Sequence, residues 1–260
     1  MKTRIISGIV MVPLLLIIYF GGIPLLAAAA LIAYVGVTEF YNGFENMGVH
    51  PSKPIAYAMI TVLYAGHLIF GVSHTFLMAW VILSMTVSMI YGWRITERKP
   101  YDAVATLTAL VYIVLFSYHI VIIDNTPYPK MTWLVVIAAF GSDIMAYFTG
   151  YFLGKHKMAP NLSPKKTIEG AVGGVVGSAV LCGIFGYFFY PTMMVHCMII
   201  GVLGGMVAEA GDLTASMFKR GMGIKDYGHL IPGHGGIMDR FDSVIFVAPA
   251  VCYYILFVLV

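Results

Sequence analysis

Charged residues and cysteines are both scarce in this sequence, and each scarcity excludes a class of protein. Only 10% of the 260 residues are Asp, Glu, Lys or Arg, whereas a typical soluble domain has about 25%. Apolar residues reach 60%, which is more than a water-soluble core can hide. The three cysteines, Cys182, Cys197 and Cys252, fall within apolar runs without metal-site spacing, so we expect them to pack as small apolar residues. An ordinary soluble domain and a disulfide-built scaffold are therefore both excluded.

Long apolar runs recur along the whole chain instead. About 20 helical residues cross a ~30 Å hydrocarbon core, and backbone groups in lipid must find partners within the protein. Continuous apolar runs meet this demand as helices rather than as the alternating strands of a barrel. We therefore predict an all-α integral membrane protein, a polytopic bundle of about nine transmembrane helices. The predicted spans are Ile5–Phe20, Ile23–Tyr41, Ile55–Gly71, Phe76–Trp93, Ala103–Ile123, Met131–Leu153, Ala171–Tyr190, Val195–Phe218 and Ser243–Val260.

The basic residues indicate which side of the membrane each connection faces. With the N-terminus in the cytoplasm, fourteen of the fifteen Lys and Arg residues fall in cytoplasmic segments, and only Lys130 falls outside. This asymmetry is what the positive-inside rule requires, and the loss of one early span would scramble it. We predict a cytoplasmic N-terminus and an external C-terminus. We also expect the first run to stay in the mature protein, because no small-residue cleavage site follows it.

The two halves of the sequence differ in character. Residues 1–130 carry apolar spans with few ionisable groups, and we expect Glu39, near the end of its span, simply to reach the interface. In residues 131–260, carboxylates enter the spans and two long polar loops appear, Gly154–Gly170 and Gly221–Asp242. Both loops face the cytoplasm in the predicted topology. We therefore predict a scaffold region before residue 130 and the functional region after it.

Five acidic residues lie within or beside the later spans. Ionised groups cost roughly 2.5 to 3.5 kcal/mol each at the centre of a membrane helix, so acids at this depth indicate function. The spacing of Asp212, Ser216 and Lys219 puts them on one helix face. Asp239 and Asp242, three residues apart, share another face, and the two faces could converge near the inner interface. The alternative is a buried ion network without chemistry. The five acids are Asp143, Glu209, Asp212, Asp239 and Asp242.

Paired aspartates beside several basic residues suit a Mg²⁺ ion that bridges phosphate oxygens. Mg²⁺ prefers one or two carboxylates with phosphates and waters, and cations offset the charge that builds up in nucleotidyl transfer. The segment Ser163–Gly170 adds Lys165, Lys166 and the hydroxyl of Thr167 just before a predicted helix start. A helix N-terminus with neighbouring cations can cradle phosphate. By itself this segment is a weak signal, because it lacks Walker A spacing and inner-loop lysines also serve topology.

Residues 216–243 carry a specific motif. They contain the pattern S-x-x-K-R, then four residues, K-D, and later P-G-H-G-G-x-x-D-R-x-D. This pattern resembles the signature of the phosphatidate cytidylyltransferase family, also called CDP-diacylglycerol synthases. The earlier segment Ser163–Gly170, the pair Gly211-Asp212 and the opening residues 2–6 are similar to that family as well, and no signature position departs from it.

The resemblance implies an enzyme with cytoplasmic catalytic loops that converts CTP and phosphatidic acid to CDP-diacylglycerol and pyrophosphate in phospholipid biosynthesis. It implies Mg²⁺, alone or with a second cation, with Asp212 and Asp239 as its ligands. The expected catalytic residues are Asp143, Asp212, Lys219, Arg220, Asp239 and Asp242. The expected substrate-binding residues are Ser163, Lys165, Lys166, Thr167, Ser216, Lys225, Asp226, His234 and Arg240. For His234, a purely structural role is an equal alternative.

The resemblance also implies membrane lipids as partners and a homodimer, and we expect no nucleic acid partner. A short chain without extra soluble domains favours a prokaryotic inner membrane as the location. Two other classes compete with this interpretation. One is another membrane enzyme of lipid metabolism, such as a polyprenol kinase or a CDP-alcohol phosphotransferase, although the D-G-x-x-A-R motif of the latter is absent. The other is an ion-coupled transporter, which would place acids in spans but would not explain two basic, glycine-containing loops on one face.

Overall fold

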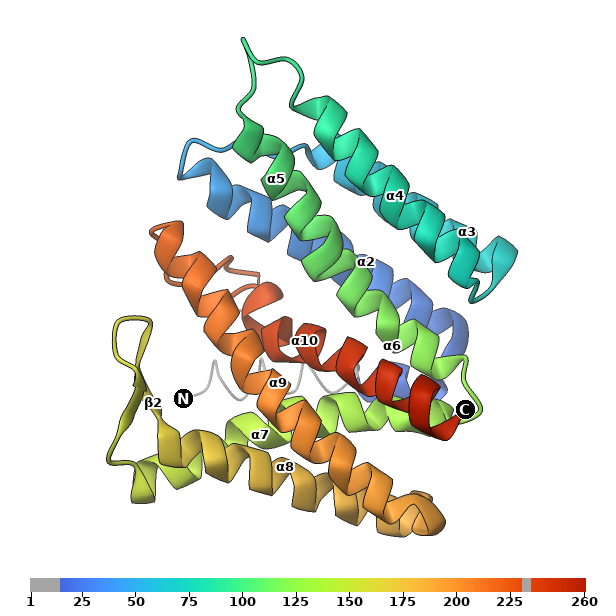
Figure 1. The fold of residues 1–260 in the computed structure, drawn as a ribbon, viewed down its shortest axis with the longest axis vertical. Coiled ribbons are helices and arrows are strands. Elements are labelled where there is room, and N and C mark those ends of the chain that lie inside the picture. Colours follow the sequence, from blue (N-terminus) through green and yellow to red (C-terminus); the bar gives the residue numbers. More distant parts are fainter. Residues whose placement is uncertain (1–14, 231–234) are drawn as a thin grey trace. The chain divides into compact units, whose positions relative to one another are not determined.

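The computed structural model describes residues 15–230 and 235–260, and these are almost entirely helical (Figure 1). Eight helices in the described residues are long and apolar enough to cross a membrane, which confirms the predicted polytopic all-α class. The main helices are α2 (Gly22–Glu45), α3 (Lys53–Phe70), α4 (His74–Tyr91), α5 (Pro100–Ala109), α6 (Phe116–Asp124), α7 (Thr132–Leu153), α8 (Ile168–Phe189), α9 (Met194–Gly221) and α10 (Met238–Tyr254).

Short non-α segments complete several of these spans. A π-helical stretch, Leu110–Leu115, joins α5 to α6 in one span, and another, Ile255–Leu259, extends α10. Single 3₁₀ turns, Pro129–Met131 and Pro191–Met193, precede α7 and α9. The last span begins at Met238, five residues before the predicted Ser243, so both aspartates of the signature lie within α10. The other predicted boundaries agree to within a few residues.

The first predicted span, Ile5–Phe20, falls mostly outside the described residues, and so do the basic residues Lys2 and Arg4. Only residues 15–20 of that span are described, and they are helical. This first span, which would bring the number of membrane helices to nine, therefore stays a prediction.

Contacts divide the chain into two compact units. The first unit runs up to Val121 and includes Gly221–Arg240; the second comprises Ile122–Arg220 and Phe241–Val260. Each unit is thus assembled from two stretches of sequence, and α10 passes from the first to the second between Arg240 and Phe241. The predicted functional boundary at residue 130 stays a prediction.

Helices α2 to α5 form most of the first unit. Serine side chains begin two of them: Ser52 accepts a hydrogen bond from the backbone N–H of Ile55 at the start of α3, and Ser73 caps α4 in the same way. Such caps satisfy N–H groups that a helix start leaves without partners. Across the unit, the buried Tyr41 hydroxyl donates to the carbonyl of Thr106 at 2.8 Å. α2 is therefore anchored to α5 within an otherwise apolar core.

The second unit packs α7, α8, α9 and most of α10 at close range. A methyl group at Gly173 or Gly177 on α8 would collide with side chains of α7. One at Gly201 on α9 would come within 2.7 Å of the Ala179 Cα atom on α8, and one at Gly205 would come within 3.0 Å of the Val175 Cα atom. Small residues at four-residue spacing let helix backbones approach each other in lipid. The close packing fixes how α7, α8 and α9 present their side chains.

The loop before α8 contains a β-hairpin that the sequence did not predict. Strands β1 (Lys157–Ala159) and β2 (Ser163–Thr167) pair antiparallel, with Lys157 opposite Thr167. The Glu169 carboxylate accepts hydrogen bonds from the backbone N–H groups of Lys155 and His156, which ties the hairpin to the first turn of α8. The sequence indicated only a long polar loop here, because the contact that holds the hairpin joins residues more than ten positions apart.

Candidate functional site

Four carboxylates gather in the second unit around one lysine. Asp143 comes from α7, Glu209 and Asp212 from α9, and Asp242 from the first turns of α10. Asp143 interacts electrostatically with the other three and with Lys166. These five residues are called the carboxylate cluster below. Asp212 and Asp242 of the later spans thus both interact with Asp143 in this unit, whereas convergence of the Asp212 face with Asp239 stays a prediction.

Lys166 enters the cluster from the hairpin. Its Nζ atom lies 2.6 Å from Glu209 Oε2 and 2.6 Å from Asp212 Oδ2. Successive side chains of a strand point to opposite faces, and β2 accordingly turns Lys166 inward, 19% exposed, while Lys165 is exposed. The two neighbouring lysines, predicted together as phosphate contacts, therefore occupy different environments.

The electrostatics keep Lys166 positively charged. Burial lowers the pKa of this ammonium group, but the charges and hydrogen bonds of Asp212 and Glu209 outweigh burial and raise the pKa above its usual value. Because Lys166 has two anionic partners, it is a counter-ion within the protein as well as a candidate for contact with substrate phosphate.

The composition of the cluster fits a hard divalent cation. Four carboxylates share the cluster with one ammonium group, which pairs with two of them. Glu209 Oε1, in a side chain only 7% exposed, has no hydrogen-bond partner. Within the described residues, no three His, Cys, Asp or Glu side chains are arranged as a complete metal-binding group. This does not conflict with Mg²⁺, which is usually held by one or two carboxylates and completes its shell with phosphate and water.

The signature loop organises the second set of candidate residues, in the first unit. Asp239, in the first turn of α10, accepts hydrogen bonds at Oδ2 from the backbone N–H of Tyr227 at 2.7 Å and of Gly236 at 2.9 Å. Gly235 has φ +84°, and a methyl group there would lie 2.7 Å from the same oxygen. The glycines were predicted to let backbone N–H groups approach an anion; the anion that Gly236 contacts is this carboxylate.

Glu39 on α2 contacts the same loop, a role that the sequence did not reveal. Its side chain does not simply reach the interface: the residue is 7% exposed. The two carboxylate oxygens accept hydrogen bonds from the backbone N–H groups of Ile237 and Met238, at 3.0 and 2.9 Å. Only its position inside an apolar span could have drawn attention to it, because its partners lie almost 200 residues away.

The remaining predicted site residues lie in varied surroundings. Ser216 is buried on α9, one turn after Asp212, and Lys219 and Arg220 follow in the last turn of that helix. Thr167 is buried and caps α8 by accepting a hydrogen bond from the backbone N–H of Gly170 at 3.1 Å.

Lys225 and Asp226 are exposed, Ser163 and Arg240 are partly exposed, and His234 lies outside the described residues. Asp212 belongs to the second unit and Asp239 to the first, so the prediction that they share one cation stays a prediction.

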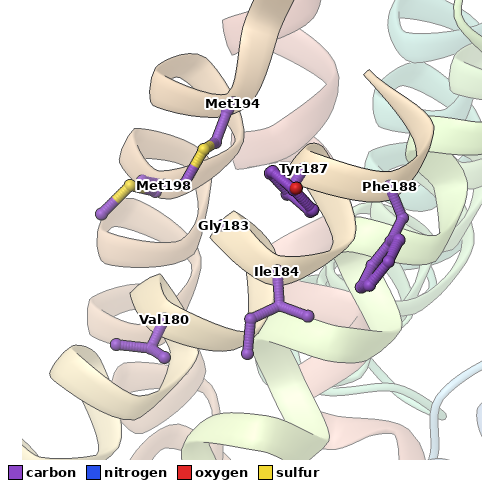
Figure 2. Close-up of a pocket in the computed structure, with 7 residues that line it drawn as sticks. All are labelled: Val180, Gly183, Ile184, Tyr187, Phe188, Met194 and Met198. Carbon is purple, nitrogen blue, oxygen red and sulfur yellow. The ribbon is translucent and has the colours of Figure 1, made fainter. Parts of the chain in front are cut away.

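A separate apolar groove of about 300 Å³ lies towards the other end of the second unit (Figure 2). It is lined from α8 and α9 by Val180, Gly183, Ile184, Tyr187, Phe188, Met194 and Met198. Its lining has no charged side chain to recognise a phosphate or nucleotide. Ile184 is sixteen residues along α8 from Ile168, which corresponds to about 24 Å of helix. The groove is therefore not the site of the chemistry.

Comparisons with known proteins identify relatives of the whole chain. The model of the cytidylyltransferase family matches residues 2–258. A protein of Synechocystis named phosphatidate cytidylyltransferase is 31% identical over 98% of this chain and 97% of its own length. Proteins with the same name from Staphylococcus haemolyticus (32% identical over 95% of this chain and 94% of their own) and Bacillus subtilis (34% over 65% and 64%) are also similar. The similarity includes both units.

Proposed function

The chain belongs to the cytidylyltransferase family and converts CTP and phosphatidic acid to CDP-diacylglycerol and pyrophosphate, and we propose that its two groups of carboxylates support this reaction. The observation that carries the assignment is the family match over almost the whole chain, with the complete signature at residues 216–243. The protein is an integral membrane enzyme, so its lipid substrate and its lipid product both remain in the bilayer.

The reaction requires two polyanions to meet. A phosphate oxygen of phosphatidic acid attacks the α-phosphate of CTP, and the bond to pyrophosphate breaks. This oxygen is already an anion at neutral pH, so no strong general base is needed. The protein must instead offset repulsion and hold the attacking and leaving oxygens in line. Basic residues of the two polar loops and of the last turn of α9 supply fixed positive charge for this purpose, with Lys165, Lys219 and Lys225 as the leading phosphate contacts.

We propose that Asp212 and Asp239 hold Mg²⁺, with Asp143 and Asp242 as further ligands or as partners of those ligands. Bound Mg²⁺ would neutralise charge on the phosphate oxygens during transfer. Lys166 keeps Glu209 and Asp212 oriented and limits repulsion among the four carboxylates of the cluster. The neighbouring Lys165 is exposed and is therefore better suited to contact a substrate that arrives from solvent.

The proposed orientation places both loops in the cytoplasm, where CTP is found, with the N-terminus inside and the C-terminus outside a prokaryotic inner membrane. The asymmetry of basic residues supports it. The family resemblance supports a homodimer, which crosslinking in native membranes would test.

The decisive test uses CTP labelled at either end. The purified protein in detergent is mixed with phosphatidic acid, Mg²⁺ and CTP that carries ³²P at the α or the γ position. Cytidylyl transfer puts the α label in the lipid and the γ label in pyrophosphate. A lipid kinase would put the γ label in the lipid, and a transporter would label no lipid; either result would contradict the proposal.

A further inference from the structure

One face of α2 packs against the signature loop, Gly221–Asp242. Gly36, Glu39, Phe40 and Gly43 recur at the spacing of a single helix face, and all four meet residues 222–238. Gly36 lies against the side chain of Met238, and Gly43 lies against that of Met222. The ring of Phe40 stacks at an angle on Tyr227, with centroids 6.0 Å apart. The described part of the signature loop therefore packs against a helix of the predicted scaffold region.

Glu39 is the polar centre of this face. Helix α10 begins at Met238, and the aliphatic side chain of Ile237, which precedes it, cannot accept a hydrogen bond from the first N–H groups of the helix. The first N–H groups of a helix need partners, and here the two oxygens of Glu39 accept from Ile237 and Met238. The positive end of the helix dipole also favours a carboxylate at this position. Burial of the Glu39 charge is thus offset by hydrogen bonds from the start of α10.

Two glycines of the loop leave room for this carboxylate. A methyl group at Gly228 would lie 2.6 Å from Glu39 Oε1, and one at Gly236 would collide with the same carboxylate. Gly236 also donates its N–H to Asp239. Glu39 and Asp239 therefore hold adjacent backbone groups of one short segment, and the orientation of one depends on that of the other.

We propose that Glu39 is a positioning residue for the transfer reaction: it fixes the first turn of α10 and the glycines of the loop, so that Asp239 is presented in a single orientation. Glu39 acts through the backbone of residues 236–238 and does not itself touch the substrate. The inference about catalysis rests on the proposed function. The structural part, that Glu39 holds the first turn of α10, can be tested without it.

The test replaces Glu39 with glutamine in the full-length protein. Glu39→Gln keeps the length of the side chain but places an NH₂ group against one backbone N–H, so a donor faces a donor. The matched control is Glu45→Gln, the same change on the same helix at a side chain that is 45% exposed and pairs with Lys53. Hydrogen exchange of a peptide that contains Ile237 and Met238, without substrate or metal, should be about tenfold faster in Glu39→Gln and unchanged in Glu45→Gln.

Kinetics then test the link to catalysis. In Glu39→Gln we expect kcat to fall by about tenfold and the Mg²⁺ concentration for half-maximal rate to rise several-fold, while the KM for CTP changes by less than about twofold. A purely structural role would lower the amount of folded enzyme without changing its Mg²⁺ dependence. Gly228→Ala, which displaces the carboxylate without removing it, should cause the same pattern more weakly and serves if Glu39→Gln does not fold.

Unchanged hydrogen exchange at Ile237 and Met238, or an unchanged Mg²⁺ requirement in both variants, would overturn the inference. An inactive wild-type enzyme with fast exchange in Glu39→Gln would contradict the proposed function but would still support the role of Glu39 in holding the start of α10. The two failures are thus distinguishable.

Discussion

The two groups of carboxylates are neutralised in different ways. In the carboxylate cluster of the second unit, Glu209 and Asp212 share the ammonium group of Lys166, a flexible side chain from a hairpin. In the first unit, Glu39 and Asp239 are held by backbone N–H groups of the signature loop. A lysine side chain can move aside when another cation or a phosphate arrives, whereas backbone donors cannot. The carboxylates of one unit therefore have an adjustable counter-ion, and those of the other have fixed hydrogen-bond donors.

The largest expected effect comes from removing a proposed ligand from each group. Asp212→Asn and Asp239→Asn should each remove more than about nine-tenths of the Mg²⁺-dependent activity, because loss of a charge contact made in the transition state usually costs at least tenfold. Rates at saturating CTP, with expression and size-exclusion behaviour as controls, measure this. A variant that keeps more than a tenth of the activity would show that its aspartate is not a required ligand.

Loss of Lys166 should mainly reduce stability. Lys166→Met leaves the buried Glu209 and its neighbours without their shared counter-ion, and removal of one partner from a buried ion pair costs roughly 3 kcal/mol. Lys165→Met, the same change one residue away at an exposed position, should cost less than about 0.5 kcal/mol. Denaturant unfolding in detergent compares the two. Equal stability of both variants would contradict the assignment of Lys166 as the counter-ion of the cluster.

The change with the smallest expected effect on the protein tests which side of the membrane the hairpin faces. A single cysteine at position 165, in a variant whose three native cysteines are replaced, should react with a membrane-impermeant maleimide only from the cytoplasmic side. The native cysteines are buried, so replacement by small apolar residues of similar volume preserves their packing best. Reaction from the outside in intact cells would reverse the predicted topology and place both polar loops away from CTP.

The helices were largely predictable from the sequence, and the contacts between distant segments were not. Apolar runs of span length predicted α2 to α10 to within a few residues, because hydropathy and length decide which segments cross a bilayer. The acids on α9 and α10 could be recognised because a charge at membrane depth is costly. Local spacing also placed Asp212 and Ser216 on one helix face correctly.

Glu39 and the hairpin were missed for a common physical reason. Glu39 caps a helix 198 residues away, and no local pattern in α2 reports that contact. Similarly, the inward turn of Lys166 follows from the pairing of β1 with β2, which hydropathy does not register in so short a segment. What decides these features is which distant backbone groups need a partner, and this becomes visible only when the chain has folded.

The central claim is that carboxylates on α9 and α10 together bind a divalent cation. The most direct measurement is a titration of the purified protein with Mn²⁺, followed by electron paramagnetic resonance of the free ion, in the wild type, Asp212→Asn and Asp239→Asn. We expect one saturable site in the wild type and its loss in both variants. Wild-type binding in either variant would contradict the claim.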